Sequence, residues 1–287
     1  MKSGQLGCRL RALAKDSARA AGITSGAAST ARVVADVALY RALKLGSIPG
    51  ENRPRSIRLK AGDTITYRLN RGDIQGIREV LVDQVYRPPI TIRPRVIVDL
   101  GANIGLTSVF LRNLFHPDIL IAVEPDPSNA NLARLNLGCG ATVIEAAVSP
   151  RDGIGTYVAA RDSNLGSLQQ KDALSREDSH SVRLITMTSI LSTLPGGRID
   201  LLKMDIEGGE EALLTGQTDW LSSVGAIIAE FHPDRVDYPG LVESLVASGF
   251  RYTAAGSVWP GSMDFFVRDR EWWADTTRDQ ATFSATT

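Results

Sequence analysis

The residues of this sequence that are best suited to chemistry are carboxylates and glycines that follow short apolar runs. One such run begins at Val96 and leads into the stretch DLGANIG at residues 99–105. Glycines let a backbone turn tightly and approach a ligand, and the free amides at the start of a following helix favour a polar or negatively charged group. We therefore predict a ligand-binding turn between a strand and a helix. Its candidate binding residues are Asp99, Gly101, Ala102, Asn103 and Gly105.

The spacing of this turn helps to choose its ligand. NAD, FAD and S-adenosylmethionine all place an adenosine moiety at the carboxyl ends of parallel strands. The glycines follow the pattern GxNxG, whereas a pyrophosphate is brought onto a helix end by GxGxxG. The Asp99 carboxylate would repel a pyrophosphate, but it can organise the turn amides and face the ammonium group of a methionine moiety. The pattern therefore favours S-adenosylmethionine over a dinucleotide.

A second carboxylate, Glu124, follows the next apolar run and precedes Pro125. It can accept hydrogen bonds from both ribose hydroxyls, as the acidic residue about 20 positions after the glycine turn does in dinucleotide folds. Taken alone, Asp99 could cap a turn and Glu124 could serve as the charge at a helix N-terminus. Their positions at consecutive strand ends favour an adenosyl site that includes Glu124 and Pro125. An NAD-dependent oxidoreductase or epimerase on a similar scaffold is the alternative.

The acceptor side of the site is predicted at the ends of two further apolar runs. Lys203, Asp205 and Glu207 occupy alternate positions in the stretch LLKMDIEGGE, and alternate positions of a strand share a face. Glu230 and His232 follow the next run. Neighbouring strand ends lie about 5 Å apart, so these side chains should meet over one pocket, where we expect Asp205 to contact the cofactor as well. A structural alternative pairs Lys203 with Asp205 or Glu207, and lets Glu207 cap the next helix.

Two chemistries remain open on this face. His232, near its ordinary pKa, can take the proton of an acceptor hydroxyl as a sulfonium methyl is attacked, and one of the acids Asp205, Glu207 and Glu230 can do the same. Alternatively, Asp205 and Glu230 can hold a Mg²⁺ ion that lowers the pKa of the acceptor oxygen. We favour a protein base over the metal. His232 can also simply pack at the strand end.

Three stretches of the sequence resemble the FkbM family of methyltransferases. They are DLGANIG at Asp99–Gly105, VEPDP at Val123–Pro127 and LLKMDIEGGE at Leu201–Glu210, in this order. The resemblance covers roughly Arg95 to Arg268. It implies methyl transfer from S-adenosylmethionine, generally to a hydroxyl oxygen, with sugars, glycolipids and polyketide-type natural products as the classes of acceptor to expect.

From Arg95 onwards, short apolar runs alternate with helical stretches, which is typical of a parallel sheet covered on both faces. We predict a doubly wound α/β fold of the class I methyltransferase, Rossmann-like type, with a mainly parallel seven-stranded sheet. The last two strands are joined by a loop too short for a crossover helix, so they should pair antiparallel. The expected strands are 96–100, 119–123, 141–144, 199–204, 226–229, 251–254 and 264–268, and the expected helices are 104–114, 127–137, 209–215 and 241–248.

The N-terminal third predicts a smaller accessory layer. Apolar residues recur at helical spacing from Val33 to Leu43 and predict an amphipathic helix that covers the main domain. Residues 56–69 predict a hairpin and 74–85 a helix, and the prolines at 88–89 mark a boundary. The expected parts of the chain are a basic and helical extension at 1–50, an accessory hairpin and helix at 51–94, the methyltransferase domain at 95–270 and a mobile tail at 271–287.

Composition limits the partners. Lys+Arg and Asp+Glu both number 32, so no net field draws the chain to nucleic acid. No apolar stretch reaches the roughly 18 residues of a membrane helix, and Cys8 and Cys139 lack metal-binding or disulfide spacing. We expect a cytoplasmic protein with a small-molecule or glycan acceptor, and leave a homodimer open. Residues 161–168 are a candidate for lining the acceptor cleft or an ordinary surface turn. Trp259, Trp272 and Trp273 are candidates for sugar stacking, with the core or an interface as the favoured alternative.

Overall fold

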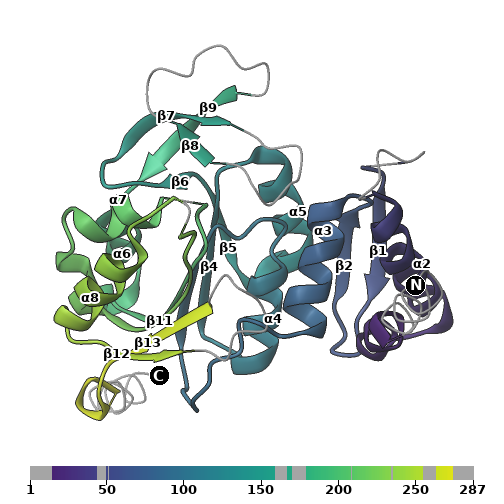
Figure 1. Cartoon of the computed structure of the whole chain (residues 1–287), viewed down its shortest axis with the longest axis horizontal. Coiled ribbons are helices and arrows are strands. Elements are labelled where there is room, and N and C mark those ends of the chain that lie inside the picture. The colour runs from purple at the N-terminus through teal and green to yellow at the C-terminus, as the bar shows by residue number, and fades with distance from the viewer. Residues whose placement is uncertain are drawn as a thin grey trace, which may run out of the picture.

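The computed structural model has three parts, which Figure 1 shows together. A large sheet with helices on both faces forms the centre. A layer from the N-terminal part of the chain lies on one side, and a small sheet lies beyond one end of the large one. The structure describes residues 15–43, 50, 52–158, 167–169, 179–207, 209–233, 235–254 and 263–273.

The central sheet has seven strands. They are β3 (Val96–Leu100), β4 (Ile119–Glu124), β5 (Thr142–Glu145), β10 (Ile199–Met204), β11 (Val224–Glu230), β12 (Arg251–Ala254) and β13 (Met263–Val267). Their order across the sheet is β12-β13-β11-β10-β3-β4-β5. The first five strands of this sheet in chain order run parallel to one another, and β13 runs antiparallel to both β11 and β12. The predicted doubly wound α/β fold is therefore confirmed, including the antiparallel pairing of its last two strands.

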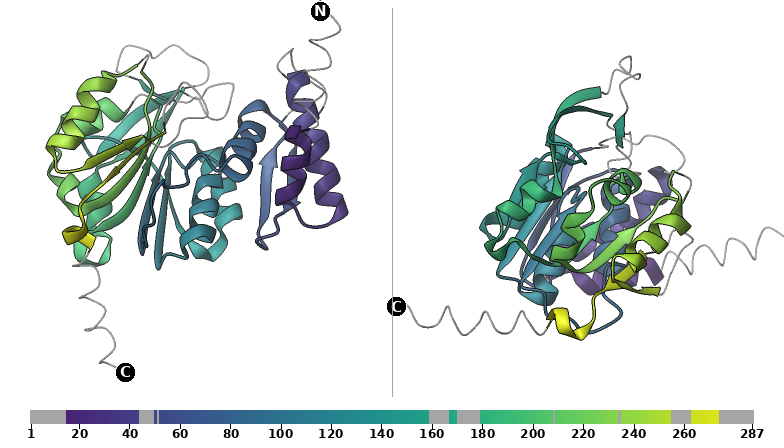
Figure 2. Two further views of the ribbon diagram at one scale, coloured as in Figure 1. Left: turned by 60° about the horizontal axis from the view of Figure 1, so that its bottom comes forward. Right: turned by 90° about the vertical axis from the view of Figure 1, so that its left-hand side faces the viewer.

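Helices cover both faces of this sheet. On one face lie α4 (Leu106–Phe115) and α5 (Pro127–Leu137), and on the other lie α6 (Met187–Ser192), α7 (Glu210–Thr215) and α8 (Tyr238–Ala247) (Figures 1 and 2). Three short 3₁₀ helices connect them: η2 (Gly138–Gly140), η3 (Pro195–Gly197) and η4 (Asp219–Ser223). All six residues of β10 are buried, because apolar side chains meet it from both sides.

The parallel register brings the ends of the strands to one edge. Lys203 of β10 pairs with Asp99 of β3, and Met204 pairs with Ala229 of β11. The residues that follow these positions, Asp205 and Glu230, therefore emerge side by side at the carboxyl edge. Ligands bind at this edge in open α/β sheets.

The N-terminal layer, a name used here for the described residues between 15 and 86, packs on the face that carries α4. It contains α2 (Ala27–Leu43), the hairpin of β1 (Pro54–Arg58) and β2 (Thr64–Arg68), α3 (Arg71–Gly76) and the π-helix η1 (Ile77–Val82). The expected helix at 74–85 starts earlier, because the Asn70 side chain accepts a hydrogen bond from the Asp73 amide and caps α3.

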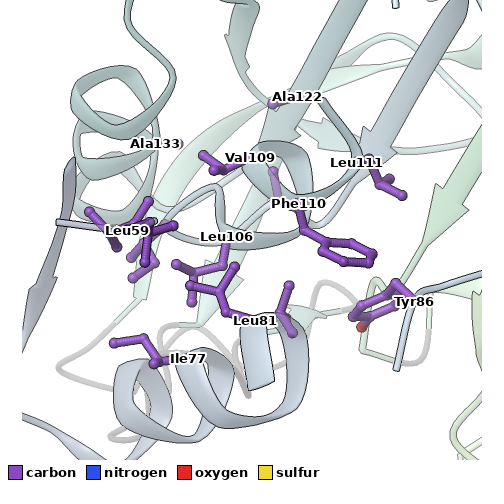
Figure 3. Packing of buried hydrophobic residues seen from close by; sticks show 14 of the residues in the cluster. Leu59, Ile77, Leu81, Tyr86, Leu106, Val109, Phe110, Leu111, Ala122 and Ala133 are labelled. Carbon is purple, nitrogen blue, oxygen red and sulfur yellow. The ribbon is translucent and has the colours of Figure 1, made fainter. Parts of the chain in front are cut away.

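One continuous core joins the N-terminal layer to the central domain. Ile77 and Leu81 of η1 belong to the same buried cluster as Leu106 and Phe110 of α4 (Figure 3). The cluster also reaches Ala122 of β4, one of the strands of the central sheet. The layer therefore buries apolar surface of the main domain, and its side chains have fixed positions relative to the sheet.

The chain between β5 and α6 forms a sheet of its own. Its strands are β6 (Ala147–Val148), β7 (Gly153–Val158), β8 (Ser167–Gln169) and β9 (Ser179–Ile185), in the order β6-β9-β7-β8. Because β6 follows β5 after a single residue, this sheet starts at the carboxyl edge of the large one. The predicted acceptor loop at 161–168 falls mainly outside the described residues, with Ser167 and Leu168 in β8. Trp259 also lies outside them.

Candidate active site

The predicted ligand-binding turn joins β3 to α4. The amides of Gly101 and Ala102 both donate to the Val123 carbonyl at 3.0 Å, which ties the turn to β4. Gly101, Asn103 and Gly105 all have positive φ angles, of 72°, 50° and 82°. Left-handed backbone is costly for most residues other than glycine. This explains why two glycines flank an asparagine here.

The reasons for the two glycines differ from the expected approach to a ligand. A Cβ atom at Gly101 would lie 1.8 Å from the Asp205 carbonyl oxygen, and one at Gly105 would lie 3.3 Å from the Cβ of Ala133 in α5. Gly101 therefore lets the ends of β3 and β10 come together, and Gly105 lets α5 pack closely against the turn.

Asp99 lies beneath the turn and is fully buried. Its carboxylate accepts a hydrogen bond of 2.6 Å from the Ser108 hydroxyl and lies 3.1 Å from the Lys203 ammonium. Lys203 also donates to the Gly101 carbonyl at 2.8 Å. Burial opposes the Lys203 charge, but Asp99 and Asp205 outweigh it and raise the pKa of Lys203. The expected contact between Asp99 and a ligand ammonium is thus replaced by an internal ion pair that holds the turn.

The structural alternative, in which Lys203 pairs with Asp205 or Glu207, is only partly confirmed. Its nearest carboxylate is that of Asp99, whereas the Asp205 carboxylate lies 3.8 Å away. The ion pair with Asp99 crosses from β10 to β3 at matched register positions. The ion pair therefore ties the end of β3, from which the ligand turn starts, to the end of β10.

Glu124 ends β4 and is 3% exposed. One carboxylate oxygen accepts from the Asn103 amide at 2.7 Å and the other accepts from the Asp126 amide at 3.0 Å. Asn129 of α5 donates to it at 3.4 Å. Burial raises the pKa of Glu124 to about 7, although these hydrogen bonds oppose the shift. A carboxylate has about four acceptor sites, and these donors use three of them, so Glu124 retains one for a hydroxyl donor.

The acceptor side brings together side chains from distant segments. The Tyr86 hydroxyl donates to Asp205 Oδ2 at 2.9 Å and to Glu230 Oε2 at 3.2 Å. Burial and the nearby Asp205 raise the pKa of Glu230 to about 8. Burial and the same two carboxylates raise the pKa of Tyr86 well above its ordinary value, so its hydroxyl remains protonated. The structure thus confirms that the ends of β10 and β11 meet, and it adds Tyr86.

His232 lies between two other carboxylates. Its Nε2 atom is 3.3 Å from Glu207 and its Nδ1 atom is 3.3 Å from Glu210, which is fully buried. Burial disfavours the imidazolium, but the hydrogen bond to Glu210 and the charge of Glu207 outweigh it and raise the pKa of His232 to about 9. The expectation of an ordinary His232 pKa is therefore wrong. Protonated at neutral pH, this imidazole is poorly suited to accept a proton.

Glu207 completes this group in an unusual backbone conformation, with a φ angle of 56°. Besides His232, its carboxylate accepts from Arg235 at 3.1 Å. Burial and then the nearby Asp205 raise the pKa of Glu207 to about 7.

A different set of residues from the predicted pair has the geometry of a metal site. Single ligand atoms of Asp205, Glu207 and His232 all lie within 4.8 Å of one another. Glu230 is not part of this group among the described residues, and its carboxylate instead shares the Tyr86 hydroxyl with Asp205. The chemistry of the donors would suit a divalent cation only if His232 lost its proton.

Several contacts of the site had no signal in the sequence. Ser108 lies three residues after the first recognised stretch and Glu210 ends the third, but no pattern in the sequence relates them to Asp99 and His232. Tyr86 precedes the prolines of a predicted boundary, and no motif surrounds it. Trp272, a predicted stacking residue, instead lies against Arg198 and over Gly225, near the amino ends of β10 and β11. Trp272 therefore lies at the opposite end of these strands from the acceptor side.

The order of the central strands, with the glycine turn after β3 and a carboxylate after β4, is that of the class I methyltransferases, which use S-adenosylmethionine. Residues 99–252 match the family described as Methyltransferase FkbM domain. The chain therefore belongs to the FkbM methyltransferase family, and its cofactor is S-adenosylmethionine. The family match therefore supports methyl transfer and not the NAD-dependent alternative.

Two relatives share most of their length with this chain. The 31-O-demethyl-FK506 methyltransferase FkbM of Streptomyces tacrolimicus is 26% identical over 229 residues, which cover 67% of this chain and 85% of the relative. Methyltransferase 1 of Beauveria bassiana is 22% identical over 206 residues, 63% of this chain and 82% of that protein. Among solved structures, the precorrin-6y C5,15-methyltransferase of Geobacter metallireducens is 16% identical, with a TM-score of 0.40, over 67% of this chain and 88% of that one.

The residues of the turn fit the cofactor. In the described part of the chain, Asn103 Oδ1 is buried without a hydrogen-bond partner, which leaves an acceptor for a ligand donor. It belongs to the same residue whose amide binds Glu124. None of the helices among the described residues is long and apolar enough to cross a membrane.

Proposed function

We propose that this protein transfers the methyl group of S-adenosylmethionine to a hydroxyl oxygen of a small molecule or glycan. Sugars, glycolipids and polyketide-type natural products are the acceptor classes. The observation that carries the proposal is the half-buried carboxylate pair of Asp205 and Glu230 beside the ligand turn, joined through the Tyr86 hydroxyl. The printed name of the Streptomyces relative, a methyltransferase acting on an O-demethyl compound, supports oxygen as the acceptor atom.

In this proposal Glu230 accepts the proton of the acceptor hydroxyl. The bound cofactor supplies an electrophilic methyl group on a sulfonium. As the acceptor oxygen forms its bond to carbon, the carbon–sulfur bond breaks with its electron pair left on sulfur, and the hydroxyl proton passes to the Glu230 carboxylate. A base with a pKa of about 8 is well matched to a hydroxyl acceptor at neutral to mildly basic pH.

Asp205, Glu207 and His232 hold and tune this base. Asp205 raises the pKa of Glu230 through its charge, and the charge of His232 lowers it. Glu207 and Glu210 hold the imidazolium of His232. On the cofactor side, Glu124 and Pro125 would contact the ribose, and Asp99 would act through the turn. The turn itself would offer the main chain of Gly101, Ala102, Asn103 and Gly105.

The test is product analysis with a methyl-labelled cofactor and a panel of hydroxylated sugars, glycolipids and polyketides. The expected product carries the label as a methyl ether, identified by mass spectrometry and NMR. A labelled methyl on nitrogen or carbon would contradict oxygen transfer.

The same assay with EDTA tests the protein base against a metal. We expect turnover to persist in the chelator. Loss of turnover that Mg²⁺ restores would instead support a cation held by Asp205 with Glu207 and His232, or with Glu230.

A further inference from the structure

We infer that Tyr86 is a positioning residue of the active site, and that the N-terminal layer thereby completes the acceptor side. This inference rests on the proposed role of Glu230 as the base. Tyr86 lies outside residues 99–252, which match the family domain. Its hydroxyl nevertheless contacts the two carboxylates that the domain places at the ends of β10 and β11.

The geometry makes Tyr86 a link between the two carboxylates. One hydroxyl lies within hydrogen-bond distance of both Asp205 Oδ2, at 2.9 Å, and Glu230 Oε2, at 3.2 Å. A phenol has a single proton to donate, so the two acids compete for it. The acid that is ionised receives the stronger hydrogen bond. Tyr86 therefore stabilises the deprotonated form of Glu230 that accepts a proton.

The surroundings fix the position of the Tyr86 ring. The side chain is 4% exposed and belongs to the core that contains Leu81 and Phe110 (Figure 3). The Lys203 ammonium lies 5.3 Å from the ring centroid, within the range of a cation–π contact. Two main-chain hydrogen bonds hold the turn that carries it, from Val85 to Glu79 and from Arg87 to Gln84.

Because Tyr86 is buried, its hydroxyl cannot take its hydrogen bonds from bulk solvent. A buried hydroxyl needs partners, and here the partners are both acids of the acceptor side. The link therefore joins the core of the N-terminal layer to the chemistry at the sheet edge. A layer that only covered apolar surface would not require a tyrosine at this position.

The first test measures the side-chain carboxyl of Glu230 by ¹³C NMR in the full chain without cofactor, assigned with Glu230→Gln. Tyr86→Phe should raise the pKa of Glu230 by roughly one unit, because the carboxylate loses a charge-assisted hydrogen bond. Tyr40→Phe is the matched control, since Tyr40 donates at 3.2 Å to Gln75 within the same layer. An unchanged Glu230 titration in folded Tyr86→Phe would overturn the inference.

The titratable and charged groups that act on Glu230 come from η1 and the turn after it, from β10 and the residues after it, and from the residues after β11. They are Asp205, His232, Lys203, Glu79 and Tyr86. Only Tyr86 changes in the variant, so a shift in the Glu230 titration reports the lost hydroxyl. A structural role alone would lower the melting temperature of Tyr86→Phe and Tyr40→Phe and leave this titration unmoved.

A second measurement needs no Tyr86 variant. In the wild-type protein with ¹³Cζ-labelled tyrosine, the Tyr86 signal should shift with the titration of Glu230 near pH 8, and Glu230→Gln should remove this shift. A Tyr86 signal that is constant across that range would overturn the inference.

Turnover provides the functional readout. With an acceptor in hand, Tyr86→Phe should lower kcat about tenfold at pH 7.5, move the acid limb of the rate profile to higher pH and leave cofactor affinity unchanged. A protein that binds no S-adenosylmethionine would refute the proposed function, while the carboxyl titration would still decide the contact of Tyr86.

Discussion

The cofactor side and the acceptor side of this site are held together in different ways. On the cofactor side, the Glu124 carboxylate accepts main-chain amides from Asn103 and Asp126, which lie 21 and 2 residues away. On the acceptor side, the Tyr86 hydroxyl contacts side chains that lie 119 and 144 residues away. Main-chain contacts depend on the backbone of a local motif, whereas side-chain contacts depend on how distant segments pack.

The largest effect is expected at Gly101, where the turn of the cofactor side meets the end of β10 on the acceptor side. Gly101→Ala should destabilise the protein by on the order of 3–5 kcal/mol or prevent folding, because its Cβ would strike the Asp205 carbonyl. Gly26→Ala is the matched control, since Gly26 has a φ of 83° and open space around its Cβ position. It should cost only about 1–2 kcal/mol of backbone strain.

Denaturant unfolding measures both variants. Equal losses of unfolding free energy in Gly101→Ala and Gly26→Ala would mean that the ends of β3 and β10 are farther apart than the structure places them.

The contrast between local main-chain contacts and distant side-chain contacts also explains which features could be predicted from the sequence. The seven strands of the central sheet and the helices α4, α5, α7 and α8 followed from apolar runs that alternate with helical spacing. Helix α6 and the small sheet of β6 to β9 were not predicted. The meeting of residues from neighbouring strand ends at one edge of the sheet followed from the predicted parallel topology. The contact with Tyr86 and the raised pKa of His232 did not, because both depend on packing between segments that no local pattern relates.

The next largest effect concerns the base. Glu230→Gln should lower kcat by about 10²–10⁴-fold with cofactor affinity unchanged, and the wild-type rate should rise with pH through about 8 as Glu230 loses its proton. Glu243→Gln, an exposed position on α8, is the control. If turnover survives in Glu230→Gln but falls in His232→Ala, then His232 and not Glu230 accepts the proton.

A smaller effect is expected on the cofactor side. Glu124→Ala should weaken S-adenosylmethionine binding by roughly 10–150-fold, because the charge-assisted hydrogen bond between the ribose and the free acceptor site of Glu124 is lost. Glu145 pairs with Glu124 in the sheet register but is exposed beside Arg134, so Glu145→Ala is a matched control. Calorimetry that finds equal affinity in the two variants would remove Glu124 from the cofactor site.

The smallest expected effect is on stability as a function of pH. The pKa values of Glu124, Glu207 and Glu230 lie above their ordinary 4.5 in the folded protein, and that of His232 lies above 6.5. Folded molecules therefore hold protons that the unfolded chain has released, so stability should fall as pH rises from about 5 to 9.

Thermal unfolding across this range tests the trend. The melting temperature should drop by several degrees, at about 2–4 °C for each kcal/mol, and Glu230→Gln should reduce the drop. A melting temperature that rises with pH would contradict the burial of these acids in the folded state.

The most direct test of the account is calorimetric titration of the wild-type protein with S-adenosylmethionine, its demethylated product and NAD side by side. The glycine turn and Glu124 predict that the first two bind one site per chain and that NAD does not bind. Affinity should also increase as pH rises through about 7, because the ribose hydroxyls require the ionised Glu124 carboxylate. NAD binding equal to or tighter than that of S-adenosylmethionine would contradict the assignment.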